Sequence, residues 1–201
     1  MFYPLAFSFG DGESEEGWTW FLRHLRDAYG NPANLVIVSV RHKSIAKAMS
    51  SVYPGVPHLV CYYNLKENLK NHCRGRKDIM ELYAKAAYLY QVHSCNTSLT
   101  QIQNSHLSLF NMLVEAGVDR WARAYFPGQR YQMMTTNIAE ALNNCIKRAR
   151  RLPIIAALEF LRDMFQRWFY DQRERAVKNQ TYLTTAASNH CKVMYDELLA
   201  F

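Results

Sequence analysis

The sequence predicts an α/β fold in which a few parallel strands are followed by a long helical region. Three short apolar runs, at residues 2–9, 35–38 and 58–63, alternate with stretches of helical periodicity. Strands that alternate with helices in this way are typical of a parallel sheet. The 201 residues are enough for one domain with a substantial core. From residue 65 onward the pattern is helical, so the predicted sheet lies in the first part of the chain.

The elements of this first part have recognisable ends. The predicted strand at 2–9 carries Pro4 near its start, where a missing backbone N–H is tolerated. A helix is predicted over residues 15–29, because its apolar side chains recur on one face and a Gly-Asn-Pro segment follows it. The run at 35–38 is uniformly apolar, as expected of a buried strand. A second helix is predicted over 44–52, before a Pro-Gly pair.

The rest of the chain is predicted to be helical almost throughout. A Pro-Gly pair at 127–128 interrupts the pattern, and no internal repeat is visible. The segment after residue 180 has only a weak pattern. The predicted helices span residues 65–73, 78–92, 98–116, 119–125, 136–151 and 154–178.

Composition narrows the class of protein. A net charge of +7 and a pI near 9.2 favour an anionic partner, most commonly nucleic acid, although a basic surface alone is not specific. Five cysteines at irregular spacing, with no C-x-x-C pair, favour reduced thiols in the cytosol or nucleus. No apolar run reaches the roughly 18 residues of a membrane span, and the first residues lack the pattern of a signal peptide.

One segment resembles a known family. Residues Ile37 to Ile45 read IVSVRHKSI, which is similar to the IVSDRHKSI segment of Mutator-like (MULE) plant transposases. The resemblance continues in the family's order over most of the chain. Its other blocks lie at residues 2–7, 58–68, 121–130, 136–147 and 152–173.

This resemblance implies a ribonuclease-H-like (DDE transposase) core that lacks its first two strands, with a large helical insertion and C-terminal helices. Without those central strands, we expect the strand at 2–9 to pair in parallel with residues 35–39. The chain is then a single partial MULE transposase domain over 1–201. Its parts are a remnant sheet region (1–63), a helical insertion (64–130), C-terminal helices with the catalytic Glu and basic residues (131–178) and a tail (179–201).

The resemblance also identifies the positions of the catalytic acids. Transposases of this family cut DNA with two divalent metal ions, normally Mg²⁺, held by three carboxylates. The first acid belongs upstream of the block at residue 2 and is expected to be missing. The second position is occupied by Val40, whose alkyl side chain cannot bind a metal. The third corresponds to Glu140. With one acid of three, we expect no metal site, no cofactor and no enzymatic activity.

Several residues admit a second interpretation. Glu140 has capping-box spacing with Asn137 and is therefore also a candidate for a purely structural role. The family's Cys-x-x-His pair is Cys61-Tyr-Tyr-Asn64 here, without the histidine. His58, Cys61, His72 and Cys73 match no standard zinc spacing. Ser39 lies near His42, but the segment lacks the glycines of a nucleophile elbow, and the other histidines are scattered.

Basic residues near the C-terminus are the candidate DNA contacts. They can bind phosphates, or they can form an ordinary solvated face. The main hypothesis is a degenerate, N-terminally truncated and inactive transposase core in the nucleus. The alternative is a transposase-derived DNA-binding or protein-interaction module in transcription regulation; a working nuclease would need acids from elsewhere. The candidate DNA-binding residues are Lys147, Arg148, Arg151, Arg162 and Arg173.

Overall fold

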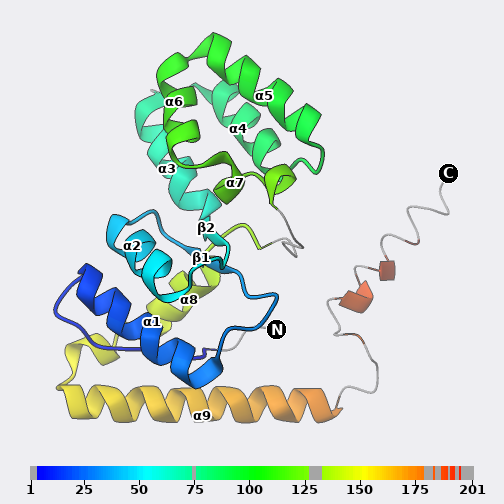
Figure 1. Cartoon of the computed structure of the whole chain (residues 1–201). Coiled ribbons are helices and arrows are strands. Elements are labelled where there is room, and N and C mark those ends of the chain that lie inside the picture. The colour runs from blue at the N-terminus through cyan, green and yellow to red at the C-terminus, as the bar shows by residue number, and fades with distance from the viewer. Residues whose placement is uncertain are drawn as a thin grey trace. The chain divides into compact units, whose positions relative to one another are not determined.

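A computed structural model describes residues 4–73, 76–126 and 133–178, together with 183, 187–189, 191–192 and 195 (Figure 1). The chain divides into two compact units, Ala6–Ala141 and Leu142–Phe201 with Met1–Leu5. The helices of the first unit are α1 (Glu15–Tyr29), α2 (Lys43–Val52), α3 (Tyr62–Cys73), α4 (Lys77–Tyr88), α5 (Val92–Ser105), α6 (Leu107–Glu115), α7 (Val118–Trp121) and the 3-10 turn η1 (Arg123–Tyr125), and its strands are β1 (Ile37–Ser39) and β2 (His58–Val60). Helix α8 (Asn137–Cys145) contains the boundary, and the second unit holds the 3-10 turn η2 (Ala149–Arg151) and α9 (Ile154–Lys178).

Helix α1 has the bounds that the sequence predicted. The hydroxyl of Ser14 accepts a hydrogen bond from the N–H of Gly17 at 3.0 Å, which caps the free N–H groups of the first turn. Gly30 ends the helix at φ 74°, a conformation that glycine adopts at little cost. The apolar face of α1 packs on α2 through a small core that includes Leu22 and Met49.

The sheet that the structure describes is a parallel pair. Strands β1 and β2 align Ile37 with His58 and Ser39 with Val60, and helix α2 connects them. This confirms the predicted parallel pairing of these two segments. Both strands are shorter than the apolar runs that predicted them, and α3 begins directly after β2.

The predicted strand at 2–9 is wrong for its described part. Residues 4–9 have no regular structure, and the described sheet contains only β1 and β2, so these six residues do not form the expected pairing with 35–39; residues 2 and 3 lie outside the described part. Leu5, Phe7 and Phe9 are 60%, 39% and 44% exposed. A three-residue β1 provides few backbone partners for another strand, and Pro4 cannot donate.

The helices α3 to α7 surround the largest core, which contains Trp121 and Tyr83 (Figure 1). The indole N–H of Trp121 donates to the carbonyl of Leu113 at 3.0 Å, so this buried donor is satisfied. The sequence predicted helices over 78–92 and 98–116. In the structure the chain leaves the helix at 89–91 and again at His106, which produces three shorter helices.

The C-terminal unit has a smaller core. Ala149, Ala157 and Leu161 are buried where η2 packs on α9. The predicted helix over 136–151 ends at Cys145 and continues as turns and η2, whereas α9 has its predicted bounds. None of the described helices is long and apolar enough to cross a membrane.

Candidate functional site

The carboxyl ends of β1 and β2 form the sheet edge where the family's second acid is expected. The N–H of Cys61 donates to the carbonyl of Ser39 at 2.9 Å, which holds these two chain segments side by side. Val40 follows Ser39 directly and is 37% exposed. The carboxyl ends of parallel strands are where α/β proteins commonly place their active residues. Val40 therefore occupies a position that can face a substrate.

Glu140 is linked to the end of β2 by the segment before α8. The N–H of Tyr62 donates to the carbonyl of Met134 at 2.7 Å, and the N–H of Thr136 donates to the sulfur of Cys61 at 3.3 Å. The hydroxyl of Thr136 in turn donates to a carboxylate oxygen of Glu140 at 3.0 Å. These contacts connect Glu140 through Thr136 to Cys61, at the end of β2. Strand β2 is in turn paired with β1, which Val40 follows.

The chemistry of this edge does not fit a two-metal centre. Mg²⁺ requires hard oxygen ligands in near-octahedral arrangement, and the valine side chain offers none. Glu140 supplies one carboxylate. Among the residues that the structure describes, no group of three or more His, Cys, Asp or Glu side chains lies close enough together to hold a metal ion.

The expected capping box is wrong in its details. Asn137 is the first residue of α8 and not its cap, and its N–H donates to the hydroxyl of Thr135 at 3.4 Å. The first helical hydrogen bond runs from the N–H of Glu140 to the carbonyl of Thr136 at 3.0 Å, so Thr136 is at the capping position. Glu140 lies one turn into the helix, where its charge favours the N-terminal dipole.

Asn64 belongs to the same network. It stands where the family has the histidine of its Cys-x-x-His pair, and its side-chain N–H₂ donates to the Thr136 hydroxyl at 3.5 Å. Cys61 is fully buried. Of the other residues considered for zinc, His72 contacts the carbonyl of Asn68 at 2.7 Å on its own helix, and the side chain of Cys73 lies outside the described residues.

Ser39 has a partner that sequence reasoning missed. Its hydroxyl lies 2.8 Å from Nε2 of His58 on the neighbouring strand. On the other side of the ring, Arg120 donates to Nδ1 of His58 at 3.2 Å and to the His58 carbonyl at 3.0 Å. Because these residues are 19 and 62 positions apart in the chain, their spacing contains no signal for the contact.

The direction of these hydrogen bonds excludes a Ser–His nucleophile. Arg120 has only donors, so Nδ1 of His58 must accept and the ring proton is on Nε2, which donates to Ser39. The Ser39 hydroxyl then donates to the carbonyl of Val40 at 2.8 Å. Burial and the nearby Arg120 charge lower the pKa of His58 to about 4, which keeps the ring neutral at pH 7. His58 cannot take the proton of Ser39 in this arrangement, and the cluster is structural.

The predicted DNA-binding residues all have exposed side chains. Arg162 and Arg173 are eleven residues apart on α9, which places them on one face about three turns apart. Arg162 contacts the neighbouring Asp163 at 3.4 Å. The remaining three precede α9, in the turn after α8 (Lys147, Arg148) and in η2 (Arg151).

A groove on the C-terminal unit uses a different set of charges. It has a volume of about 430 Å³ and is lined in part by Asp163, Arg167, Asp171 and Arg175. These four residues alternate in sign at a spacing of four, the spacing at which opposite charges are neighbours on a helix surface. Neither Arg162 nor Arg173 lines this groove. This groove therefore does not include the two arginines of α9 that the sequence singled out.

Comparison with known proteins identifies the first part of the chain. A family model described as MULE transposase domain matches residues 1–68. The matched part contains Val40, Cys61 and Asn64 but ends before Glu140 and the basic C-terminal residues. No curated protein matches the sequence. The resemblance to Mutator-like transposases is therefore confirmed for residues 1–68, the part that matches the MULE transposase domain.

Proposed function

We propose that this chain is a degenerate core of a Mutator-like transposase that neither cuts nor joins DNA. The observation that carries the proposal is the sheet edge where Val40 lies beside the network that holds Glu140. A valine in the place of a metal-binding aspartate removes a ligand, and among the described residues no group of three or more His, Cys, Asp or Glu side chains could hold a metal ion. The family match over residues 1–68 makes the relation to transposases specific.

The proposed fold is the corresponding part of a ribonuclease-H-like core. Support comes from the parallel pair β1–β2, its connection through α2, and an acid-bearing helix that reaches the carboxyl edge of the sheet. In this proposal, α3 to α7 form the helical insertion of the family. Segment 131–178 then corresponds to the helices that carry the third acid and the basic residues.

A nicking assay tests the loss of activity. The whole chain is incubated with supercoiled plasmid and about 10 mM Mn²⁺, and we expect no nicking above that of buffer. Nicking by the wild-type chain that is lost in Glu140→Gln, but kept in the control Glu159→Gln on α9, would show a working metal site and refute the proposal. Both substitutions neutralise one exposed glutamate, so they match in charge.

The second candidate function is DNA binding by the C-terminal unit, as in a nuclear module derived from a transposase. The segment 142–178 contains nine lysines and arginines against four acidic residues, so it contributes +5 of the chain's net charge of +7. Positive charge gathered on a short segment favours contact with a phosphate backbone.

Two double variants of the same helix test this candidate. Arg162→Ala/Arg173→Ala and the control Arg167→Ala/Arg175→Ala each remove two charges from α9. If the first pair contacts phosphates, the slope of log K against log salt for a short duplex falls by about 1.8, at about 0.9 for each contact. The control pair should leave the slope unchanged. Equal slopes for both variants would mean that no specific face of α9 binds DNA.

A further inference from the structure

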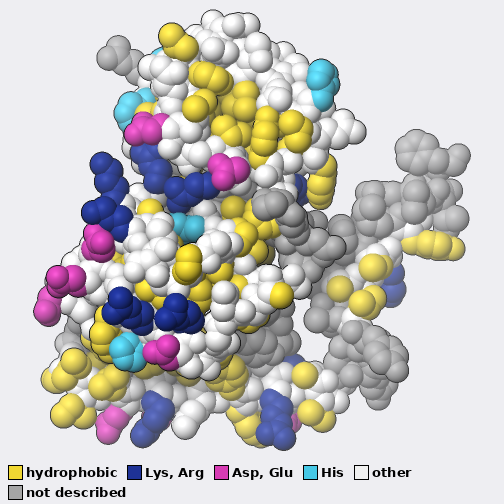
Figure 2. Space-filling view, in the orientation of Figure 1, with side chains coloured by type: hydrophobic (Ala, Val, Ile, Leu, Met, Phe, Trp, Pro, Cys, Tyr) yellow, Lys and Arg dark blue, Asp and Glu magenta, His cyan; other side chains and the backbone are white. Residues whose placement is uncertain are grey.

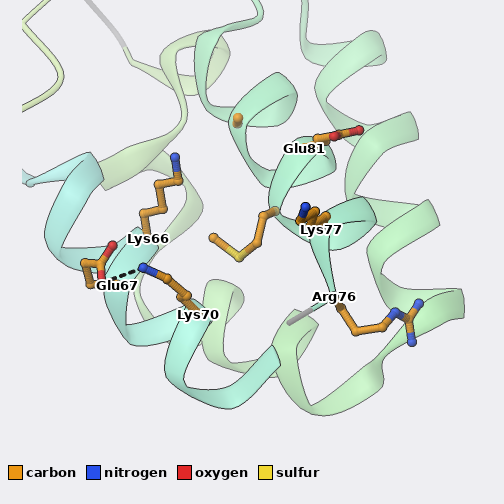
Figure 3. Close-up of a pocket in the computed structure, with 8 residues that line it drawn as sticks. Lys66, Glu67, Lys70, Arg76, Lys77 and Glu81 are labelled. Carbon is orange, nitrogen blue, oxygen red and sulfur yellow. Dashed lines mark ion pairs between the residues drawn. The ribbon is translucent and has the colours of Figure 1, made fainter. Parts of the chain in front are cut away.

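A groove between α3 and α4 carries an excess of positive charge that can attract an anion. Its volume is about 490 Å³, and it belongs entirely to the first unit. In Figure 3, Lys66 and Lys70 extend from α3, and Lys77 extends from the start of α4. The space-filling view shows Lys and Arg side chains gathered around α3 (Figure 2). Six charged residues line the groove: Lys66, Lys70, Arg76, Lys77, Glu67 and Glu81.

Positive charge exceeds negative charge in this groove. Lys70 contacts Glu67 at 3.6 Å, and Arg76 forms a 2.7 Å ion pair with Asp78. Within the described part of the chain, neither Lys66 nor Lys77 lies within ion-pair distance of a carboxylate. An ammonium group that is not neutralised by the protein can bind a phosphate from solution. Lys66 and Lys77 are therefore the principal candidates for that contact.

Aromatic rings extend from the groove at its Lys66 end. The Lys66 ammonium lies 5.8 Å from the ring centre of Tyr62, whose ring meets that of Tyr88 edge-on at 5.2 Å. The guanidinium of Arg123 lies 5.6 Å from the ring of Tyr88 and 4.7 Å from that of Tyr90. Tyr90 is nevertheless 74% exposed. A row of cations and aromatic rings thus continues from the groove onto the surface.

The protein core holds the Tyr62 end of this row in place. Tyr62 stacks on Tyr83 with nearly parallel rings at 5.2 Å, and the Tyr83 hydroxyl donates to the Tyr62 carbonyl at 3.2 Å. Tyr83 is buried against Trp121 in the main core. Rings whose orientation is already determined lose little entropy when a ligand binds.

We propose that the α3–α4 groove and the adjoining Tyr88–Tyr90–Arg123 cluster bind a single-stranded nucleic acid. Lysines would contact the phosphates, and the exposed ring of Tyr90 would stack with an unpaired base. This combination of a basic groove with aromatic surfaces is how proteins bind single strands without reading their sequence. A duplex would use the lysines alone, because its bases are already stacked on one another. An acidic peptide would likewise have no use for the ring of Tyr90.

This site differs from the one considered for the C-terminal helices and does not depend on the lost catalytic acid. Its residues lie outside the part matched by the family model, apart from Tyr62, Lys66 and Glu67. The binding of a single strand here would give the helical insertion a role of its own.

Fluorescence anisotropy of the whole chain with a labelled 15-nucleotide poly-dT strand and a 15-base-pair duplex tests the proposal. The single strand should bind more tightly than the duplex. Tyr90→Ala should weaken its binding about tenfold, whereas Tyr90→Phe keeps the stacking ring and should bind like wild type. The matched control is Tyr170→Ala, which removes an exposed tyrosine on α9 and should have no effect.

The salt dependence tests the lysines separately. Lys66→Gln/Lys77→Gln should lower the slope of log K against log salt by about 1.4, at about 0.7 for each single-strand phosphate contact. The control Arg23→Gln/Lys43→Gln removes two exposed charges from α1 and α2 and should leave the slope unchanged. Thermal melts of every variant show whether it is folded.

The proposal would be overturned if the single strand did not bind, or if the groove variants and their controls had equal effects. It would also be overturned if a glutamate peptide competed for the site as strongly as poly-dT does. These outcomes do not depend on the results of the plasmid-nicking assay or of the duplex-binding assay on the α9 variants. Loss of duplex binding in Arg162→Ala/Arg173→Ala with intact poly-dT binding would support two separate nucleic-acid surfaces.

Discussion

Replacing Val40 by aspartate is expected to create a weak divalent-metal site with Glu140. Val40 follows β1, and Glu140 is linked through Thr136 and Cys61 to the end of the neighbouring β2. Val40 is 37% exposed, so the substitution itself should cost about 1 kcal/mol or less. Two carboxylates attract a cation that one alone binds too weakly to detect. We expect a dissociation constant on the order of 1 mM, typical of weak carboxylate sites.

The expected stabilisation of Val40→Asp by the metal follows from the linkage between binding and folding. At about 10 mM Mn²⁺ and a dissociation constant near 1 mM, binding stabilises the folded chain by RT ln 11, or about 1.4 kcal/mol. For a chain of this length, 1 kcal/mol shifts the Tm by roughly 2–4 °C, so the shift should be about 3–6 °C. Differential scanning fluorimetry with and without Mn²⁺ measures it directly.

Two further variants make the experiment specific. Val40→Asn has a similar size but no charge and should show no metal-dependent shift. Val40→Asp/Glu140→Gln removes the second carboxylate and should lose the shift. A shift that persists in this double variant would mean that Glu140 does not share the edge with position 40, and the geometric argument for a degenerate catalytic site would fail.

Three other predictions concern the stability of the fold. Between pH 6.5 and about 4 the unfolded chain binds a proton that folded His58 does not, so the free energy of unfolding falls as pH decreases through this window, by at most about 3 kcal/mol. His58→Gln should remove this contribution, and a difference in Tm between variant and wild type that is constant from pH 7 to 4 would contradict the assignment. Trp121→Phe should lower the free energy of unfolding by about 1 kcal/mol for the lost hydrogen bond to the Leu113 carbonyl, plus the cost of the cavity. Trp121→Ala should lower it by about 3–5 kcal/mol. Urea titrations measure both losses, and smaller values would mean that the site is loosely packed. Ser14→Ala should cost about 1 kcal/mol through the loss of the α1 cap, whereas Ser14→Asp should keep the cap, and equal melting of both variants would show that the cap contributes nothing.

Elements with strong local signals could be predicted from the sequence. Helix α1 begins after a capping serine and ends at a glycine, and α9 begins directly after Pro153; both have the predicted bounds. The breaks at 89–91 and at His106 were missed because those segments contain neither glycine nor proline. Their position depends on how α4, α5 and α6 pack around the main core. Packing of this kind overrides a continuous helical pattern.

The segment before β1 shows the opposite error. Residues 4–9 have an apolar pattern that favours a strand, yet a strand needs a partner of sufficient length as well as a suitable sequence. The described part of β1 is only three residues long. A propensity for β-structure, read from the sequence, therefore could not show whether a partner strand would be available.

For the candidate site, too, some features could be predicted from the sequence and others depended on the tertiary structure. The sequence alone determined that position 40 carries an alkyl group, that Glu140 carries a carboxylate and that the chain has an excess of positive charge, because these are properties of individual side chains. Only the tertiary structure decided that Thr136, which precedes α8, contacts Cys61 at the end of β2, and that Arg120 orients His58 against Ser39. Those contacts join segments 19 to 75 residues apart, and proximity over such distances arises from the packing of whole helices and strands, which no local pattern encodes.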